Sequence, residues 1–259
     1  MLGDILQNAR GRVHILKELP HIDKILARQA SEQPPHRGFI RALRTATTKP
    51  ALIAECKQAS PSEGLIRQDY DPVGHALDYE RAGAHCLSVL TEPSGFLGDE
   101  AHLVDVRHEV ELPVLRKDFI IDEFDIRKSK AIGADCILLI VAILDQPQLR
   151  DFYQQATSLG LDVLVEVHTE AEAERAMEIG AVMIGVNNRN LSSFKTDLAA
   201  TEQIFPLLSS NILKVSESGL KTSEDVRRVR DAGADAVLIG TTFMRQTDLV
   251  SAVKDLMPW

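Results

Sequence analysis

Residues 132–140 read IGADCILLI, and four other segments of the chain repeat this pattern. In each copy a helical stretch ends at a glycine and an apolar run follows. The glycine suits the end of a helix, where the backbone must adopt a left-handed conformation. The apolar run is typical of a parallel strand that is covered by helices. The other copies are AGAHCLSVL (82–90), LGLDVLVEV (159–167), IGAVMIGV (179–186) and AGADAVLIG (232–240).

The spacing of these copies predicts the number of strand–helix units. The first and last marker glycines, Gly83 and Gly233, lie 150 residues apart. If the two longest gaps between markers each hold two units, six units average 25 residues, which suits a strand followed by a helix. We therefore predict an α/β protein, a (β/α)8 TIM barrel. Its strands are expected near 51–56, 85–90, 112–117, 135–141, 162–167, 182–186, 212–217 and 236–240.

The segments around these strands predict helices. Amphipathic helices are expected at 73–83 and 223–233, with Ser223 as the N-cap of the second. Residues 1–47 precede the barrel and are too short for a core of their own, so we predict a single domain, 1–259, with an N-terminal helical cap (1–47) on a barrel (48–259). Within the cap we expect a helix marked by Ile5, Ala9, Val13 and Leu16 that stops at Pro20, a short second helix at Ile22, Ile25 and Leu26, a linker at 31–38 and a helical turn at 39–43.

Composition excludes several classes of protein. The chain has 259 residues, a net charge of −9 and 44% hydrophobic residues, which argues against disorder and against nucleic acid as the main partner. No apolar run reaches 18 residues and the N-terminus has no apolar signal segment, so neither a membrane span nor secretion is expected. Three widely spaced cysteines predict no disulfide framework or CxxC metal site, which fits a reducing cytoplasm.

Polar side chains gather where the predicted strands end, which is where such barrels place their reactive groups. Glu55 and Lys57 are two residues apart, so both should point into the barrel mouth while Cys56 points outward. Asn187 and Arg189 share a face in the same way. Further candidates at strand ends are Lys117, Glu166, Glu217 and Ser218.

Each of these residues taken singly could be a solvated rim residue or part of a structural ion pair. Because all of these polar residues are expected at the same end of one barrel, a ligand-binding or active site is favoured over scattered rim residues. His168 is expected to be a loop residue, and no other histidine lies at a metal-ligand spacing from it. Gly219 and Gly240 follow the last two strands, where barrels often bind phosphate through backbone N–H groups, and a short helix starting near Thr241 would point its positive end at the anion.

Seven ordered motifs resemble those of indole-3-glycerol phosphate synthase. They are AECKQASPSEG, LTEPSGFLG, LRKDFIIDEFDI, VEVHTEAE, GVNNRNL, VSESGL and IGTTFMR, and the resemblance runs from about Phe39 to Met244. It implies a barrel with an N-terminal cap that converts 1-(2-carboxyphenylamino)-1-deoxyribulose 5-phosphate into indole-3-glycerol phosphate, carbon dioxide and water, in tryptophan biosynthesis. It implies no metal or organic cofactor.

The resemblance also implies roles for individual residues. Lys117 would protonate the ribulose carbonyl oxygen during ring closure, and Glu55, Lys57 and Glu166 would be the acid and base candidates for dehydration. Asn187 would hold a substrate hydroxyl or orient Lys117 and Glu166. Arg189 and Ser60 would meet the substrate carboxylate, Phe96 would cover the anthranilate ring, and Glu217 and Ser218 would complete the polar network. The phosphate would fall to Gly219, Gly240 and Thr241, with help from Lys57.

Some features depart from the family pattern. Cys56 is smaller than expected, Thr241 stands where serine is common, and segment 1–36 resembles the family least. Because the sequence stops at Trp259, an isomerase partner is expected to be a separate protein, and a monomer is possible. The loops SPSEG and EPSGFLG have the composition of lids.

Other activities stay open at this point. The same barrel could house a phosphoribosylanthranilate isomerase-like sugar-phosphate isomerase, although such a site needs no pair of lysines with an arginine. Lys117 or Lys57 could form a Schiff base as in an aldolase. A non-catalytic barrel that binds phosphate ligands is the third alternative, because a fold alone does not define chemistry.

Overall fold

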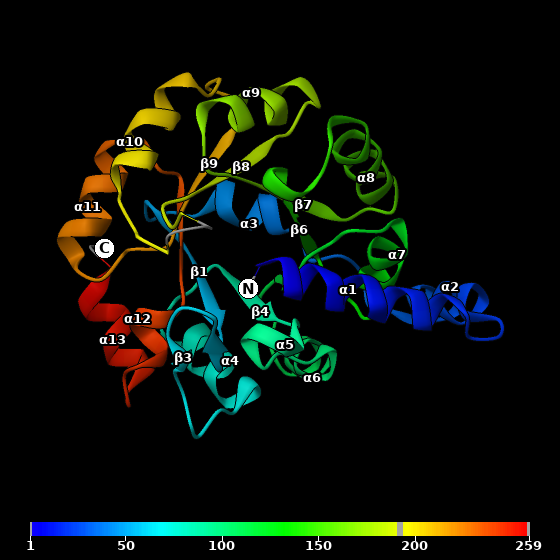
Figure 1. The fold of residues 1–259 in the computed structure, drawn as a ribbon. Helices are drawn as coiled ribbons and strands as arrows, with labels where there is room; N and C mark the ends of the chain where they lie inside the picture. Colours follow the sequence, from blue (N-terminus) through cyan, green and yellow to red (C-terminus); the bar gives the residue numbers. More distant parts are fainter. Residues whose placement is uncertain (1, 191–193, 258–259) are drawn as a thin grey trace.

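The computed structural model describes residues 2–190 and 194–257, and it forms a closed barrel of eight parallel strands (Figure 1). The strand order is β1-β10-β9-β8-β7-β6-β5-β4, and β4 pairs with β1 to close it. All eight predicted strands are confirmed. They are β1 Ala51–Cys56, β4 Cys86–Leu90, β5 Val114–Lys117, β6 Cys136–Ile140, β7 Asp162–Val167, β8 Met183–Asn187, β9 Leu213–Glu217 and β10 Ala236–Ile239.

Helices surround the barrel and follow its strands. The five marker glycines have φ between 72° and 103°, which confirms the left-handed helix ends predicted for them. One detail of the prediction was wrong: Thr222, and not Ser223, caps α11, because its hydroxyl accepts from the Asp225 N–H and the Asp225 side chain bonds back to Thr222. The helices after the cap are α4 Pro72–Arg81, α5 Pro93–Phe96, α6 Glu100–Glu109, α7 Glu123–Ala131, α8 Gln146–Ser158, α9 Glu170–Glu178, α10 Ala199–Ile204, α11 Ser223–Asp231, α12 Thr241–Met244 and α13 Leu249–Leu256, with 3-10 turns at Val141–Ile143 and Phe205–Leu207.

Two apolar cores lie on the two faces of the strands. Ile53, Leu115 and Leu164 point into the barrel, whereas Cys56 packs outward among α4 residues, as predicted. This alternation follows from the two-residue period of a strand. It also directs the polar residues that end the strands, such as Lys117, toward the barrel axis.

The N-terminal segment reaches both ends of the barrel. It contains α1 Leu2–Lys17, α2 Ile22–Glu32 and α3 Phe39–Thr45. Phe39 and Leu43 of α3 are fully buried and join the inner core, where they close the amino ends of the strands. In Figure 1, α1 runs outward from the barrel centre across α7, and α2 packs on α7. The helix α2 continues through 31–32, so the predicted linker begins two residues later; the division at 47/48 stays a prediction.

Two short segments cover the carboxyl ends of the strands. The loop after β1 forms a hairpin, β2 Ala59–Ser60 with β3 Gly64–Leu65, which the sequence pattern did not indicate. The loop after β4 contains α5, whose N-cap is the fully buried Glu92. Among the described residues, none of the helices has the length and apolar character that spanning a bilayer requires.

Candidate active site

A cavity of about 710 Å³ opens at the carboxyl ends of the strands. Every residue that the sequence predicted for the site lines it, so their proximity is established, whereas their roles stay predictions. From β1 and its loop come Glu55, Lys57 and Ser60; from α5 comes Phe96; from β5 and β7 come Lys117 and Glu166; from β8 and its loop come Asn187 and Arg189; from β9, β10 and their loops come Glu217, Ser218, Gly219, Gly240 and Thr241.

Lys117 ends β5 and extends into the cavity toward two buried carboxylates. Its Nζ lies 3.5 Å from Oε2 of Glu166 and 3.7 Å from Oε2 of Glu217. Burial lowers the pKa of this ammonium, but Glu166, Glu217 and Glu55 raise it further than burial lowers it, so the net pKa lies above the ordinary value. Lys117 is therefore a stable cation at neutral pH.

Glu55 and Lys57 form a second ion pair on the β1 side of the mouth. Nζ of Lys57 donates to Oε1 of Glu55 over 2.6 Å, and the Ser88 hydroxyl faces Oε2 at 3.5 Å. Burial raises the pKa of Glu55, yet Lys57 and Lys117 together bring it below the usual value, so this carboxyl is ionised. A Cβ at Gly240 would collide with Oε1 of Glu55, which is a reason for that glycine separate from the predicted phosphate contact.

Glu217 ends β9 and is 1% exposed. Within the described part of the chain, neither of its carboxylate oxygens has a hydrogen-bond partner. Burial raises the pKa of Glu217 to about 8; Lys117 opposes this effect, and Glu166 and Glu55 reinforce it. A Cβ at Gly185 would collide with Oε1 of this carboxyl, so β8 leaves space for Glu217 by having no side chain there.

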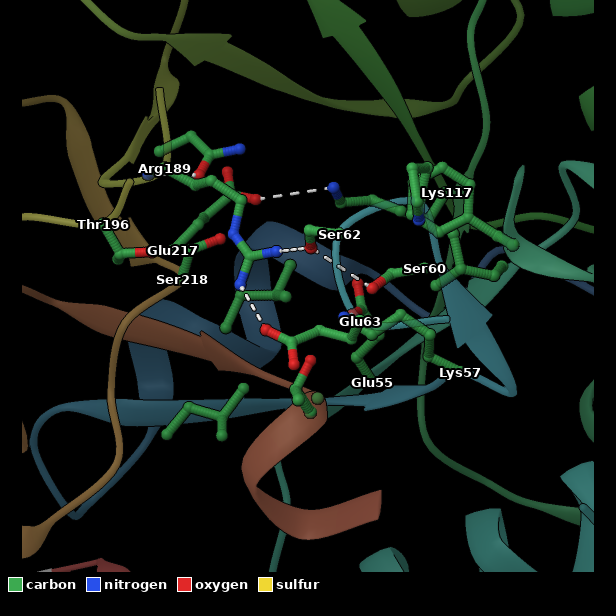
Figure 2. Close-up of a pocket in the computed structure, with 18 of the residues that line it drawn as sticks. Glu55, Lys57, Ser60, Ser62, Glu63, Lys117, Arg189, Thr196, Glu217 and Ser218 are labelled. Atoms are coloured by element: carbon green, nitrogen blue, oxygen red, sulfur yellow. Dashed lines mark hydrogen bonds and ion pairs between the residues drawn. The ribbon is translucent and has the colours of Figure 1, made fainter. Parts of the chain in front are cut away.

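Arg189 connects the β8 loop to the β2–β3 hairpin across the mouth. Figure 2 shows its guanidinium extended toward Ser62 and Glu63, with a hydrogen bond to the Ser62 hydroxyl and an ion pair of 3.6 Å to Glu63. Oδ1 of Asn187 accepts from the Arg189 N–H over 3.0 Å, which orients the turn. Asn187 and Arg189 both line the cavity, as predicted from their spacing of two residues.

The phosphate-binding prediction rests on the loops after β9 and β10. Gly219, Gly240 and Thr241 line the cavity together, and α12 begins at Thr241, as predicted. Ser218 and Gly219 both have positive φ (67° and 82°), the left-handed region that favours glycine. The anion site at these loops stays a prediction.

Sequence reasoning missed an apolar wall and a histidine. Phe119, Leu138 and Ile140 line the cavity, and the Phe119 ring lies 6.3 Å from that of Phe96. The position of Phe119, just after the end of a predicted strand, was the available signal.

His168 does lie in the β7–α9 loop, as expected, but its ring contacts Glu166. Among the described residues, no group of three or more His, Cys, Asp or Glu could hold a metal ion.

Comparisons with known proteins place this site in context. The family model described as Indole-3-glycerol phosphate synthase matches residues 2–256. The chain is 49% identical over 250 residues to indole-3-glycerol phosphate synthase of Chlorobium phaeovibrioides, covering 96% of each protein. It is 51% identical over 217 residues to that of Desulfotalea psychrophila, covering 83% of each.

Solved structures with little sequence similarity share the barrel. One is 3-hexulose-6-phosphate synthase from Salmonella typhimurium, with a TM-score of 0.65, 14% identity, and coverage of 80% of this chain and 96% of that one. Another is the N-acetylmannosamine-6-phosphate 2-epimerase from Clostridium perfringens, with a TM-score of 0.61, 13% identity, and coverage of 80% and 93%. At these identities the likeness shows the fold alone.

Proposed function

Because this chain belongs to the indole-3-glycerol phosphate synthase family, we propose that the residues lining its cavity divide the family's reaction into two proton-transfer stages. The enzyme is a carboxy-lyase of tryptophan biosynthesis that acts on a small phosphorylated substrate. It converts 1-(2-carboxyphenylamino)-1-deoxyribulose 5-phosphate into indole-3-glycerol phosphate, carbon dioxide and water. The proposal assigns each stage to an ammonium–carboxylate group in the site.

Lys117 serves ring closure as the general acid. The anthranilate ring carbon attacks the ribulose carbonyl carbon, and the carbonyl oxygen takes a proton from Nζ as its negative charge develops. The single observation that carries this assignment is the buried Lys117 ammonium, within 3.7 Å of both Glu166 and Glu217. Such a preorganised cation in a cavity stabilises a developing oxyanion without reorganisation.

Loss of carbon dioxide and water completes the reaction. The carboxylate leaves from the tetrahedral ring carbon, and its bonding electrons restore the aromatic ring. The new hydroxyl then leaves as water, for which we assign Lys57 as the acid, and Glu166 as the base that removes a carbon-bound proton. Glu55, in contact with Lys57, orients that ammonium, and Asn187 holds a substrate hydroxyl.

Substrate anions and the ring occupy the rest of the cavity. Arg189 and Ser60, which meet at the β2–β3 hairpin through Ser62, hold the substrate carboxylate. Phe96 covers the anthranilate ring. The phosphate binds the loops after β9 and β10 through Gly219, Gly240 and Thr241, with Lys57 adding positive charge, while Glu217 and Ser218 complete the polar surface of the cavity.

The structure and the family separate this proposal from its alternatives. The raised pKa of Lys117 leaves little free amine at neutral pH, which disfavours a Schiff-base mechanism. Family membership favours the synthase over a sugar-phosphate isomerase and over a barrel that only binds phosphate ligands. We further propose that the enzyme works as a monomer in the cytoplasm; its three buried, free cysteines support a reducing compartment. Light scattering tests the monomer.

Replacement of Lys117 by methionine tests the assignment. The variant removes the cation but keeps the length of the side chain. We expect kcat to fall by roughly 10³-fold or more, because both the proton and the charge at the oxyanion are lost. Indole fluorescence with chelator present measures turnover, and Lys24→Met on the exposed face of α2 is the matched control. Wild-type turnover in K117M would refute the assignment.

A further inference from the structure

We propose that His168 is a positioning residue for the dehydration step: held by Glu172, it keeps a proton at Nε2 against Oε1 of Glu166 and so holds Glu166 as an oriented carboxylate. His168 lies behind Glu166 and does not line the cavity. The inference rests on the proposed role of Glu166 as the base. It extends that proposal by naming the group that controls the base.

Glu172 fixes the His168 ring from the first turn of α9. Its Oε2 accepts the backbone N–H of His168 over 2.7 Å and lies 3.4 Å from Nδ1 of the ring. An acceptor at this place favours a proton on Nδ1. One carboxylate oxygen therefore contacts both the backbone and the ring of His168, and the other ring nitrogen faces Glu166.

Nε2 of His168 lies at an ion-pair distance of 3.4 Å from Oε1 of Glu166, and among the described residues this buried nitrogen has no hydrogen-bond partner. If Nδ1 carries a proton and Nε2 does not, two acceptors face each other in a buried setting, which is repulsive. A proton at Nε2 turns the same contact into an attraction between an imidazolium and a carboxylate. The side chains are 10% and 2% exposed, so little water is available to relieve the repulsion.

Each oxygen of Glu166 thus has a different cationic group beside it. Oε1 meets His168, and Oε2 meets Nζ of Lys117 at 3.5 Å. Glu166 itself lines the cavity, where the substrate proton would lie. A row of alternating charges, Glu172, His168, Glu166 and Lys117, runs from α9 into the cavity.

The surrounding charges agree with a protonated ring. Burial lowers the pKa of His168, but the hydrogen bond to Glu172 and the charges of Glu166, Glu172 and Glu217 raise it above the ordinary value. Burial likewise raises the pKa of Glu172, and His168 and Arg175 lower it to a net value below normal. The groups that bear on the ring come from β7, α9 and β9, and Lys117 of β5 faces the far side of Glu166.

His168→Asn is the first test, because asparagine retains a donor for Glu172 near Nδ1 but removes the cation beside Glu166. We expect kcat to fall by about tenfold to a hundredfold with KM nearly unchanged, since the base loses its orientation. The acidic limb of the kcat–pH profile should move to higher pH, because the variant removes a positive charge from beside a carboxylate. A residue that only supports folding would not move this limb.

Two further variants keep the test decisive if the asparagine variant folds poorly. His168→Gln places a neutral N–H donor near Nε2 and should recover part of kcat. Glu172→Gln keeps an oxygen for the His168 backbone N–H and should shift the acidic limb in the same direction by less. His14→Asn on the exposed side of α1 is the matched control and should match the wild type. Circular dichroism confirms folding in each case.

Glu166→Gln separates failure of this inference from failure of the proposed function. If E166Q keeps wild-type kcat, Glu166 is not the base, and the positioning role of His168 is refuted as well. If E166Q is inactive but H168N keeps the wild-type kcat and acidic limb, only the inference is overturned. Nitrogen-15 NMR of the His168 ring gives a readout besides activity: an imidazolium at pH 7 supports the inference, and a neutral ring overturns it.

Discussion

Asp135 and Glu217 are carboxylates at opposite ends of the same barrel, and each is 1% exposed. At the amino end, Oδ1 of Asp135 accepts the Arg37 N–H over 2.8 Å and faces Arg107 at 3.3 Å, and Oδ2 accepts the Val114 N–H over 2.9 Å. At the carboxyl end, Glu217 has no hydrogen-bond partner among the described residues. The two carboxyl groups are therefore equally buried, but only that of Asp135 is hydrogen-bonded to its surroundings.

The contrast separates the two tasks of the fold. Asp135 contacts the linker before α3, β5 and α6, and it directly precedes β6, so its hydrogen bonds stabilise the closed amino end of the barrel. Glu217 is buried without a hydrogen-bond partner among the described residues, which is costly for folding and useful where a substrate will supply partners. Asp135, at the amino end of the barrel, thus serves stability, and Glu217, at the carboxyl end, belongs to the predicted active site.

Asp135→Asn should give the largest change in stability. It leaves Arg107 buried without its ionic partner and replaces an acceptor of the Val114 N–H by a donor or a weaker acceptor. We expect a loss of about 3–5 kcal/mol in the free energy of unfolding. Urea denaturation measures it, with the exposed Asp151→Asn as control. Because Asp135 does not line the cavity, kcat of the folded fraction should stay unchanged; a matching loss of kcat would break the comparison.

Glu217→Gln should act on stability with the opposite sign. A carboxyl whose pKa is raised from 4.5 to about 8 stays protonated in the folded state while the unfolded chain ionises. The wild type therefore loses stability as pH rises between about 5 and about 8, and the neutral glutamine does not. The advantage of the variant should widen over this window, as thermal unfolding at several pH values will show. A gap that narrows with rising pH would contradict the raised pKa.

Gly185→Ala tests whether Glu217, at the carboxyl end of the barrel, needs the space beside Gly185. The added methyl group collides with the carboxyl, so Glu217 must shift relative to Lys117. We expect a fall in kcat of about tenfold, although no functional group is removed, and a loss of about 1 kcal/mol in stability. Gly11→Ala in α1 has open space around its Cβ and should be neutral or slightly stabilising. Unchanged kcat in G185A would show that the position of Glu217 is not critical.

Arg12→Ala should give the smallest effect. Arg12 of α1 is partly exposed and pairs with Glu92, the N-cap of α5, at 3.3 Å, and with Asp118 at 3.6 Å. Since α5 carries Phe96, we expect KM to rise about threefold, in keeping with less than about 1 kcal/mol for a partly exposed pair. Lys17→Ala, which breaks the exposed pair of α1 with Asp122, is the matched control and should leave KM as it is. Equal KM changes in both variants would mean that α1 acts on the site only through its overall docking.

The residue pattern was sufficient for the eight strands and for the end of the barrel that holds the site. Apolar runs after helix-ending glycines are local signals, and the two-residue period of a strand sends Glu55 and Lys57 to the mouth and Cys56 away from it. The N-cap of α11 was misplaced by one residue, because Thr222 and Ser223 are both suitable caps and only the backbone geometry distinguishes them.

The sequence by itself determined which residue types meet at the carboxyl ends of the strands, since strand order and side-chain alternation are encoded locally. Only the tertiary structure decided how those residues are charged and held. Within the described ranges Glu217 has no hydrogen-bond partner, Glu166 lies between Lys117 and His168, and Phe39 closes the opposite end, because folding packs separate strands, loops and helices around them. Burial and neighbouring charge set the pKa of an ionisable group, and neither can be known until the chain has folded.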